Sequence, residues 1–131
     1  MKLEEILEQE SEYFVATLIY NKLKNRYIYH NKKYHQNVSG EWKSLDSEYI
    51  EFRKDFRKEI GVVKQELQAF IDKIVKNIKE YEKNQENELE SNSLKVKCGK
   101  FCEIVDKLKT VSYYNRVMSN CKELFYVSEL P

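Results

Sequence analysis

The sequence predicts an α+β domain, predominantly α-helical, with four to five helices and a small antiparallel meander of two or three strands near residues 26–45. Three observations predict this class. Long stretches repeat apolar residues at helical spacing. Only one proline and three glycines occur in 131 residues, too few for the many turns of a β-sandwich. In one short passage residue character alternates from position to position and aromatic residues are frequent, which is typical of β-strands.

The first predicted helix covers residues 3–23 and ends before Asn25. Its apolar positions recur near one face, with further apolar residues widening that face toward the end. The positions near one face are Leu3, Ile6, Leu7, Phe14, Leu18 and Leu23.

The meander follows as three short strands, with the sequences RYIYH, KYHQ and EWKSL. Short turns at residues 31–32 and 37–40 separate them. A hairpin alone is marginally stable, so we expect the third strand or a helix beneath to support it. Tyr27, Tyr29 and Trp42 are the expected packing anchors.

Three further helices are predicted over residues 47–82, 93–109 and 111–126. Asp46 or Ser47 is a suitable N-cap for the first of them, and Gly61 is a candidate kink within it. The stretch EKNQENELESNS loses apolar periodicity, which predicts a loop or frayed helix before residue 93. The whole chain, residues 1–131, is expected to be one domain. Its helical ending directly before Pro131 predicts that it is a piece of a longer protein.

The net charge of +1 hides a strong asymmetry. Residues 1–21 and 80–90 are acidic, whereas residues 22–43 hold six basic side chains against one acid. The acidic run at 80–90 is interpreted as a solvated face, with a metal or protein docking surface as the alternative. No apolar run is long enough for a membrane helix, and no signal peptide is present. Three cysteines without a CxxC pair predict a reducing, intracellular location.

No catalytic or metal-binding motif is found, so no catalytic residue and no metal ligand is assigned. The sequence lacks GxxxxGK[ST], GxGxxG, HExxH and GxSxG. An enzyme complete within these residues is not expected. Cys98, Cys102 and Cys121 are interpreted as thiols placed mostly in the core, the alternative being a zinc site completed by His30 or His35. The two histidines themselves are expected at the surface.

The basic aromatic block is the remaining candidate site. Lys and Arg side chains contact phosphates, and exposed aromatic rings stack on unpaired bases. The alternative is that the aromatic residues are core and the lysines only solubilise the opposite face. The candidate nucleic-acid-binding residues are Lys22, Lys24, Arg26, Tyr29, Lys32, Lys33, Tyr34 and His35.

Two passages resemble the segment that precedes the superfamily 3 helicase ATPase in poxvirus-type primase–helicases of large DNA viruses and phages. The first is RYIYHNKKYHQNVSGEWKSLD, similar to the family's aromatic strand, turn and Trp-containing strand. The second is LKTVSYYNRVMSNCKELFYVSELP, similar to its closing helix and Cys/Lys/Leu/Phe cluster. The resemblance implies a hexameric replicative helicase whose ATP and Mg²⁺ are bound by a motor domain outside this segment. It also implies other replication proteins as partners and a site of action in the host cytoplasm or at a viral replication site.

The sequence therefore predicts a non-catalytic domain ahead of an ATPase motor, contributing to ring assembly, to single-stranded DNA engagement, or to both. The alternative is a helical protein-interaction module that binds no nucleic acid and uses the long helix as its docking surface. The two differ in whether the apolar stripe of that helix is buried within its own fold.

Overall fold

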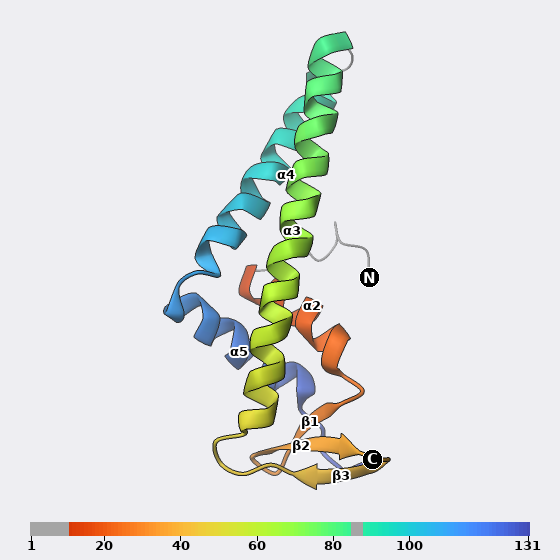
Figure 1. Ribbon diagram of the computed structural model, residues 1–131, viewed down its shortest axis with the longest axis vertical. Helices are drawn as coiled ribbons and strands as arrows, with labels where there is room; N and C mark the ends of the chain where they lie inside the picture. The colour runs from red at the N-terminus through yellow and green to blue at the C-terminus, as the bar shows by residue number, and fades with distance from the viewer. Residues whose placement is uncertain (1–10, 85–87) are drawn as a thin grey trace.

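The computed structural model describes residues 11–84 and 88–131, and its mainly helical α+β fold confirms the predicted class (Figure 1). The elements in chain order are α2 (Ser11–Leu23), β1 (Tyr27–His30), β2 (Lys33–Val38), β3 (Glu41–Ser44), α3 (Ile50–Asn84), α4 (Glu88–Lys107) and α5 (Val111–Phe125). Residues 3–10 of the first predicted helix lie outside the described residues. None of the helices in the described part of the chain is both long and apolar enough to cross a bilayer.

The molecule is elongated because α3 runs from the sheet at one end to an arm at the other (Figure 1). Its 35 residues span about 52 Å at the helical rise. The helices α2 and α5 lie beside the part of α3 nearest the sheet, and α4 returns along α3 to form the arm. We refer to the paired distal parts of α3 and α4 as the arm.

Two local predictions along these helices are wrong. Gly61 does not interrupt α3, which continues through this exposed position while Ile60 and Val63 on either side of it are buried in the core. Residues 88–92, predicted as a loop or frayed helix before a helix starting near residue 93, are the start of α4. Here Ser91 is buried, and Lys95 pairs with Glu82 of α3 at 2.9 Å. A buried serine gives no apolar signal, so periodicity alone misses this turn.

The sheet is antiparallel with strand order β1-β2-β3. Tyr29 pairs with Tyr34 across the first hairpin, and Asn37 pairs with Trp42 across the second. Each connecting turn has two central residues with positive φ, Asn31 and Lys32 in one and Ser39 and Gly40 in the other. This is the backbone of the tight hairpin turns that match the twist of the strands.

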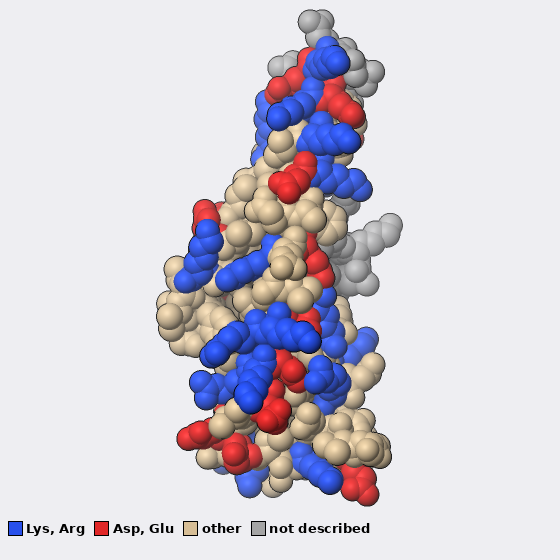
Figure 2. Space-filling view, in the orientation of Figure 1, with Lys and Arg blue, Asp and Glu red and all other residues tan. Residues whose placement is uncertain are grey.

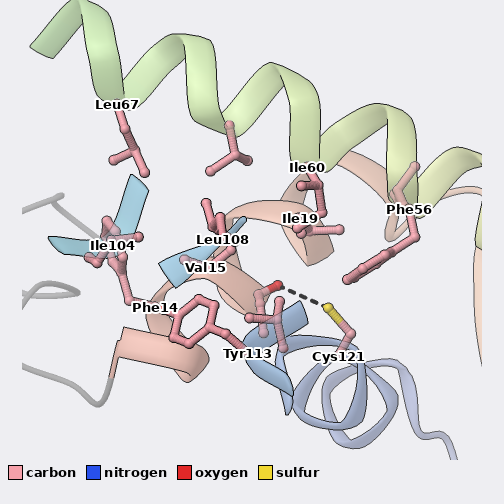
Figure 3. Packing of buried hydrophobic residues seen from close by; sticks show 14 of the residues in the cluster. Phe14, Val15, Ile19, Phe56, Ile60, Leu67, Ile104, Leu108, Tyr113 and Cys121 are labelled. Carbon is pink, nitrogen blue, oxygen red and sulfur yellow. Dashed lines mark hydrogen bonds between the residues drawn. The ribbon is translucent and has the colours of Figure 1, made fainter. Parts of the chain in front are cut away.

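The core lies between α2, α3, α4 and α5 (Figure 3). It extends to the sheet through Tyr27 and Tyr34. The Tyr34 ring stacks on Phe52 of α3 with centroids 4.0 Å apart, and Phe125 of α5 packs edge-on against Phe52 at 5.5 Å. The Cys121 thiol is 3.6 Å from the Ala16 carbonyl and donates to it. The largest fully buried side chains are Tyr27, Tyr113, Phe14, Phe52, Phe56, Phe125, Ile19, Leu23, Leu67, Val15, Val63 and Val117.

The last residues of the chain lie along the free edge of β1. The Val127 N–H donates to the Tyr29 carbonyl at 2.9 Å, and Tyr126 forms a parallel bridge with Tyr29. The strand β1 is therefore flanked by β2 on one side and by this C-terminal segment on the other. The contact joins two regions almost one hundred residues apart in the sequence.

Candidate functional site: a basic aromatic cleft

A cleft of about 420 Å³ opens between the β1–β2 turn, the loop before α3, and α5. We call it the basic cleft. Its lining residues are Tyr29, Lys32, Lys33, Tyr34, Asp46, Ser47, Tyr49, Asn115, Met118, Ser119 and Lys122.

One wall of the basic cleft comes from a single face of α5. The lining residues of α5 occupy positions i, i+3, i+4 and i+7, so the helical repeat brings them to the same side; they are Asn115, Met118, Ser119 and Lys122. The opposite wall is the first hairpin, whose turn presents Lys32 and Lys33. Sequence reasoning missed Lys122, which is about ninety residues away along the chain. Its signal in the sequence was only a polar stripe on the helix opposite Val117 and Cys121.

Three lysines line this space against one carboxylate, that of Asp46. The Asp46 Oδ1 already accepts hydrogen bonds from the backbone N–H groups of Glu48 and Tyr49, at 3.1 and 2.9 Å. The Lys122 ammonium lies over the Tyr29 ring, 4.7 Å from its centroid, in a cation–π contact. The basic cleft is therefore positive and lined in part by an aromatic ring.

Two lining residues have left-handed backbones, which side chains other than glycine rarely adopt. Lys32 has φ +62° and Tyr49 has φ +38°. In a two-residue hairpin turn, glycine is the favoured residue at the position that Lys32 occupies. Backbones of this kind cost of order 1–3 kcal/mol and cluster at functional sites. Ser39 in the second turn has a similarly positive φ of +53° outside the cleft, so the backbone at Lys32 follows from the hairpin turn and does not by itself mark a functional residue.

The structure corrects the predicted exposure of Tyr34 and His35. Tyr34 is only 3 % exposed, because it points inward onto Phe52, and burial raises the pKa of its phenol well above the usual range. Its ring is not available for stacking on a base. His35, the next residue in the strand, points to the opposite face of the sheet and is 8 % exposed, so it lies outside the basic cleft.

The remaining predicted residues are also separated from the basic cleft. Lys22 pairs with Glu66 at 2.5 Å, and Arg26 pairs with Asp55 at 2.6 Å, so acids of α3 neutralise both. Tyr27, buried beside them, donates its hydroxyl to the same Asp55 carboxylate. Lys24 is exposed just beyond the end of α2. Of the eight predicted residues, Tyr29, Lys32, Lys33 and Tyr34 line the basic cleft.

The charge elsewhere on the surface is mixed. On the face drawn in Figure 2, Lys and Arg side chains are interspersed with Asp and Glu along the length of the molecule. In the acidic run, Glu82 pairs with Lys95 across the arm. On this face, a polyanion would meet opposite charges close together rather than one broad basic patch.

The cysteines and histidines do not form a common site. Cys98 and Cys102 lie on α4, while His30 and His35 belong to the sheet. Within residues 11–84 and 88–131, no group of three or more His, Cys, Asp or Glu side chains is placed to hold a metal ion. Cys121 is fully buried, and burial raises its thiol pKa to about 12, as for a small apolar core residue.

No family model matches the sequence, no curated protein is detectably similar to it, and no solved structure matches it.

Proposed function

We propose that this chain is the non-catalytic domain preceding the ATPase motor of a viral replicative primase–helicase, and that its basic cleft binds single-stranded DNA. One observation carries the proposal. The two passages that resemble the family, residues 26–46 and 108–131, supply the two walls of the cleft. Passages that are far apart in sequence and separately similar to one family thus meet at one charged site.

The chemistry of the lining suits an unpaired nucleic-acid strand. Lys32, Lys33 and Lys122 offer ammonium groups to phosphates, and the rings of Tyr29 and Tyr49 line the same space. A base would stack on Tyr29 by displacing the Lys122 ammonium from the ring face. A volume of about 420 Å³ is near the lower end for ligand pockets. It accommodates a short piece of a single strand rather than a duplex.

In this proposal the chemistry of the parent protein lies in its motor, where ATP and Mg²⁺ would bind. The domain contributes binding, and the hexameric ring and other replication proteins are its protein partners. It acts in the reducing interior of the host cell, at the site of viral replication.

The rival proposal, a protein-interaction module, needs an exposed stripe on the long helix. Val63, Leu67 and Ile71 of that stripe are buried in the fold of the chain itself. Phe70 is 41 % exposed, but its ring stacks on Phe101 of α4 with centroids 6.1 Å apart. The apolar surface that this alternative requires is therefore largely used internally, and we do not adopt it.

The test measures binding of a fluorescein-labelled oligothymidylate by anisotropy at several salt concentrations. Substituting Lys32→Glu, Lys33→Glu and Lys122→Glu together should weaken binding strongly. The slope of log binding constant against log salt concentration is negative, and each lysine that contacts one phosphate contributes about 0.7 to its magnitude. Loss of three such contacts should therefore reduce the magnitude of the slope by about 2. A double variant, Lys32→Glu with Lys33→Glu, should give an intermediate effect.

The matched control reverses two exposed charges on the arm, Lys73→Glu with Lys76→Glu, roughly 35 Å along α3 from the basic cleft. This pair makes the same charge change as the double variant and should leave the slope nearly unchanged. Equal losses in both double variants would indicate only general charge attraction. Unchanged affinity in the cleft variants, with native circular dichroism, would remove the proposed role.

The proposed stacking of a base on an aromatic ring of the basic cleft is tested separately at Tyr29. Tyr29→Leu removes the ring and should cost about 1–3 kcal/mol of binding if a base stacks there. Tyr29→Phe keeps the ring and should bind nearly as the native protein does. An abasic oligonucleotide of the same length should show no difference between the two variants, because it has phosphates but no bases.

A further inference from the structure

The outer face of the sheet, away from the core, carries two histidines side by side. Alternation along the strands places His30 of β1 and His35 of β2 on this face. Their partners in the register are Lys33 and Ile28 respectively, which makes the two histidines diagonal neighbours. Their ring centroids are 5.9 Å apart, and the ring planes are tilted by 59°.

Both rings have the same nitrogen engaged by the backbone. The His30 Nδ1 is 3.2 Å from the Val127 carbonyl, and the His35 Nδ1 is 3.1 Å from the Lys33 carbonyl. A carbonyl oxygen can only accept a hydrogen bond, so Nδ1 must carry the proton in each ring. In the neutral rings, Nε2 is then left with a free lone pair.

This is the arrangement that metal-binding histidines use. Such a histidine commonly donates one ring N–H to a backbone carbonyl, which fixes the tautomer and orients the other nitrogen toward the ion. In this protein two neighbouring rings share that arrangement, and His35 is largely buried, so its ring is held by its surroundings.

The spacing of the rings also fits a shared ion. With a metal–nitrogen distance of about 2.1 Å, a ring centroid lies roughly 3.2 Å from the ion, so two rings on one ion have centroids about 5–6.4 Å apart. The observed 5.9 Å lies within that range. Val127 is on the edge of β1 opposite β2, so the Nδ1 of His30 faces away from β2. The far side of the ring faces the strand that carries His35.

We propose that His30 and His35 bind one borderline divalent transition-metal ion, of the class of Zn²⁺, Ni²⁺ and Cu²⁺, through their Nε2 atoms. Imidazole is a suitable ligand for each of these ions. With two protein ligands the other positions belong to water, so the ion is exchangeable. It links β1 to β2 and, through the His30–Val127 contact, stabilises the C-terminal segment against the sheet. Lys33, which lines the basic cleft, is also the register partner of His30, so the metal site adjoins the basic cleft but uses different side chains as ligands.

Trp42 provides a direct readout, because it is the only tryptophan and lies on the same face of the sheet, one strand beyond His35. Untagged protein is titrated with Ni²⁺ while Trp42 fluorescence is recorded, and Zn²⁺ binding is measured by calorimetry. We expect saturable quenching and one ion per chain.

The variants His30→Asn and His35→Asn keep an N–H donor near the place of Nδ1 and remove Nε2. Each should lower the affinity for Ni²⁺ by about tenfold or more, since one of two protein ligands is lost. The control variant Cys102→Ser removes the exposed thiol on α4 and should bind as the native chain does. The proposal is overturned if quenching does not saturate, if both histidine variants keep native affinity while folded, or if Cys102→Ser abolishes binding.

Discussion

Replacing Phe52 by alanine should destabilise this fold more than any comparable change at its surface. Phe52 is 0 % exposed and joins three elements: the sheet, α3 and α5. Its ring is within 4.0 Å of the Tyr34 centroid, 5.2 Å of Tyr27 and 5.5 Å of Phe125. The substitution removes these three aromatic contacts, together with the longer ones to Phe56 at 6.1 Å and Tyr49 at 6.3 Å, and leaves a cavity where the sheet docks on the helices.

A buried Phe→Ala substitution costs about 3–5 kcal/mol through lost apolar transfer and the residual cavity. Each aromatic pair adds about 0.5–1.5 kcal/mol beyond burial. We therefore expect a loss near the upper end of the range, about 4–5 kcal/mol. With an m-value of about 2 kcal/mol/M in urea, the unfolding midpoint should fall by roughly 2 M.

Phe70→Ala is the matched control, because it makes the same chemical change in the same helix. Phe70 is 41 % exposed and has one aromatic partner, Phe101, so its loss should cost about 1–2 kcal/mol. Urea unfolding followed by circular dichroism gives both values. A loss below about 1 kcal/mol for Phe52→Ala, or one no larger than for Phe70→Ala, would contradict the packing argument.

Two other predictions concern thiol chemistry and helix capping. Burial raises the pKa of Cys121 to about 12 from an ordinary 9.0, so at pH 8 a thiol reagent should modify the exposed Cys102 rapidly and Cys121 only after unfolding. The Cys121 thiol proton is lost at a lower pH in the unfolded chain than in the folded one, so the contribution of Cys121 to the free energy of unfolding should decline as pH rises from about 9 to 12. Cys121→Val should abolish that decline. Rapid modification of Cys121 in the native protein would contradict its burial. Thr110 caps α5 by accepting from the Tyr113 N–H at 3.3 Å and also donates to the Lys107 carbonyl at 2.8 Å. Thr110→Ala should cost about 1 kcal/mol in thermal or urea unfolding while Thr110→Ser costs less, and equal losses would show that the hydroxyl is not responsible.

The elements with strong periodicity were predictable from the sequence. The end of α2 at Leu23, the α4–α5 break at Lys109–Thr110 and the meander all follow from local patterns. The first turn of α4 was not predictable, because Ser91 is a polar residue that is buried where α4 packs on α3. The periodicity of a segment predicts which face of its helix or strand a residue occupies. Whether that face is buried depends on which other elements of the chain pack against it.

The candidate site was predictable only in part for the same reason. Lys32 and Lys33 belong to a local turn and could be singled out. Lys122 joins them because α5 packs beside β1, a contact that no local pattern encodes. Conversely, the alternation that predicts strands also requires Tyr34 and His35 to point in opposite directions, so both could not line one surface.

The unbroken course of α3 has a mechanical consequence. It begins directly after Tyr49, at the rim of the basic cleft, and ends about 52 Å away at the tip of the arm. A rod of that length turns a tilt of about 5° at the sheet into a displacement of roughly 4–5 Å at the tip. A molecule bound at the tip of the arm could therefore change the tilt of α3 through a small movement of the tip. That tilt would in turn move the loop beside Tyr49, so the two ends of α3 would be mechanically coupled.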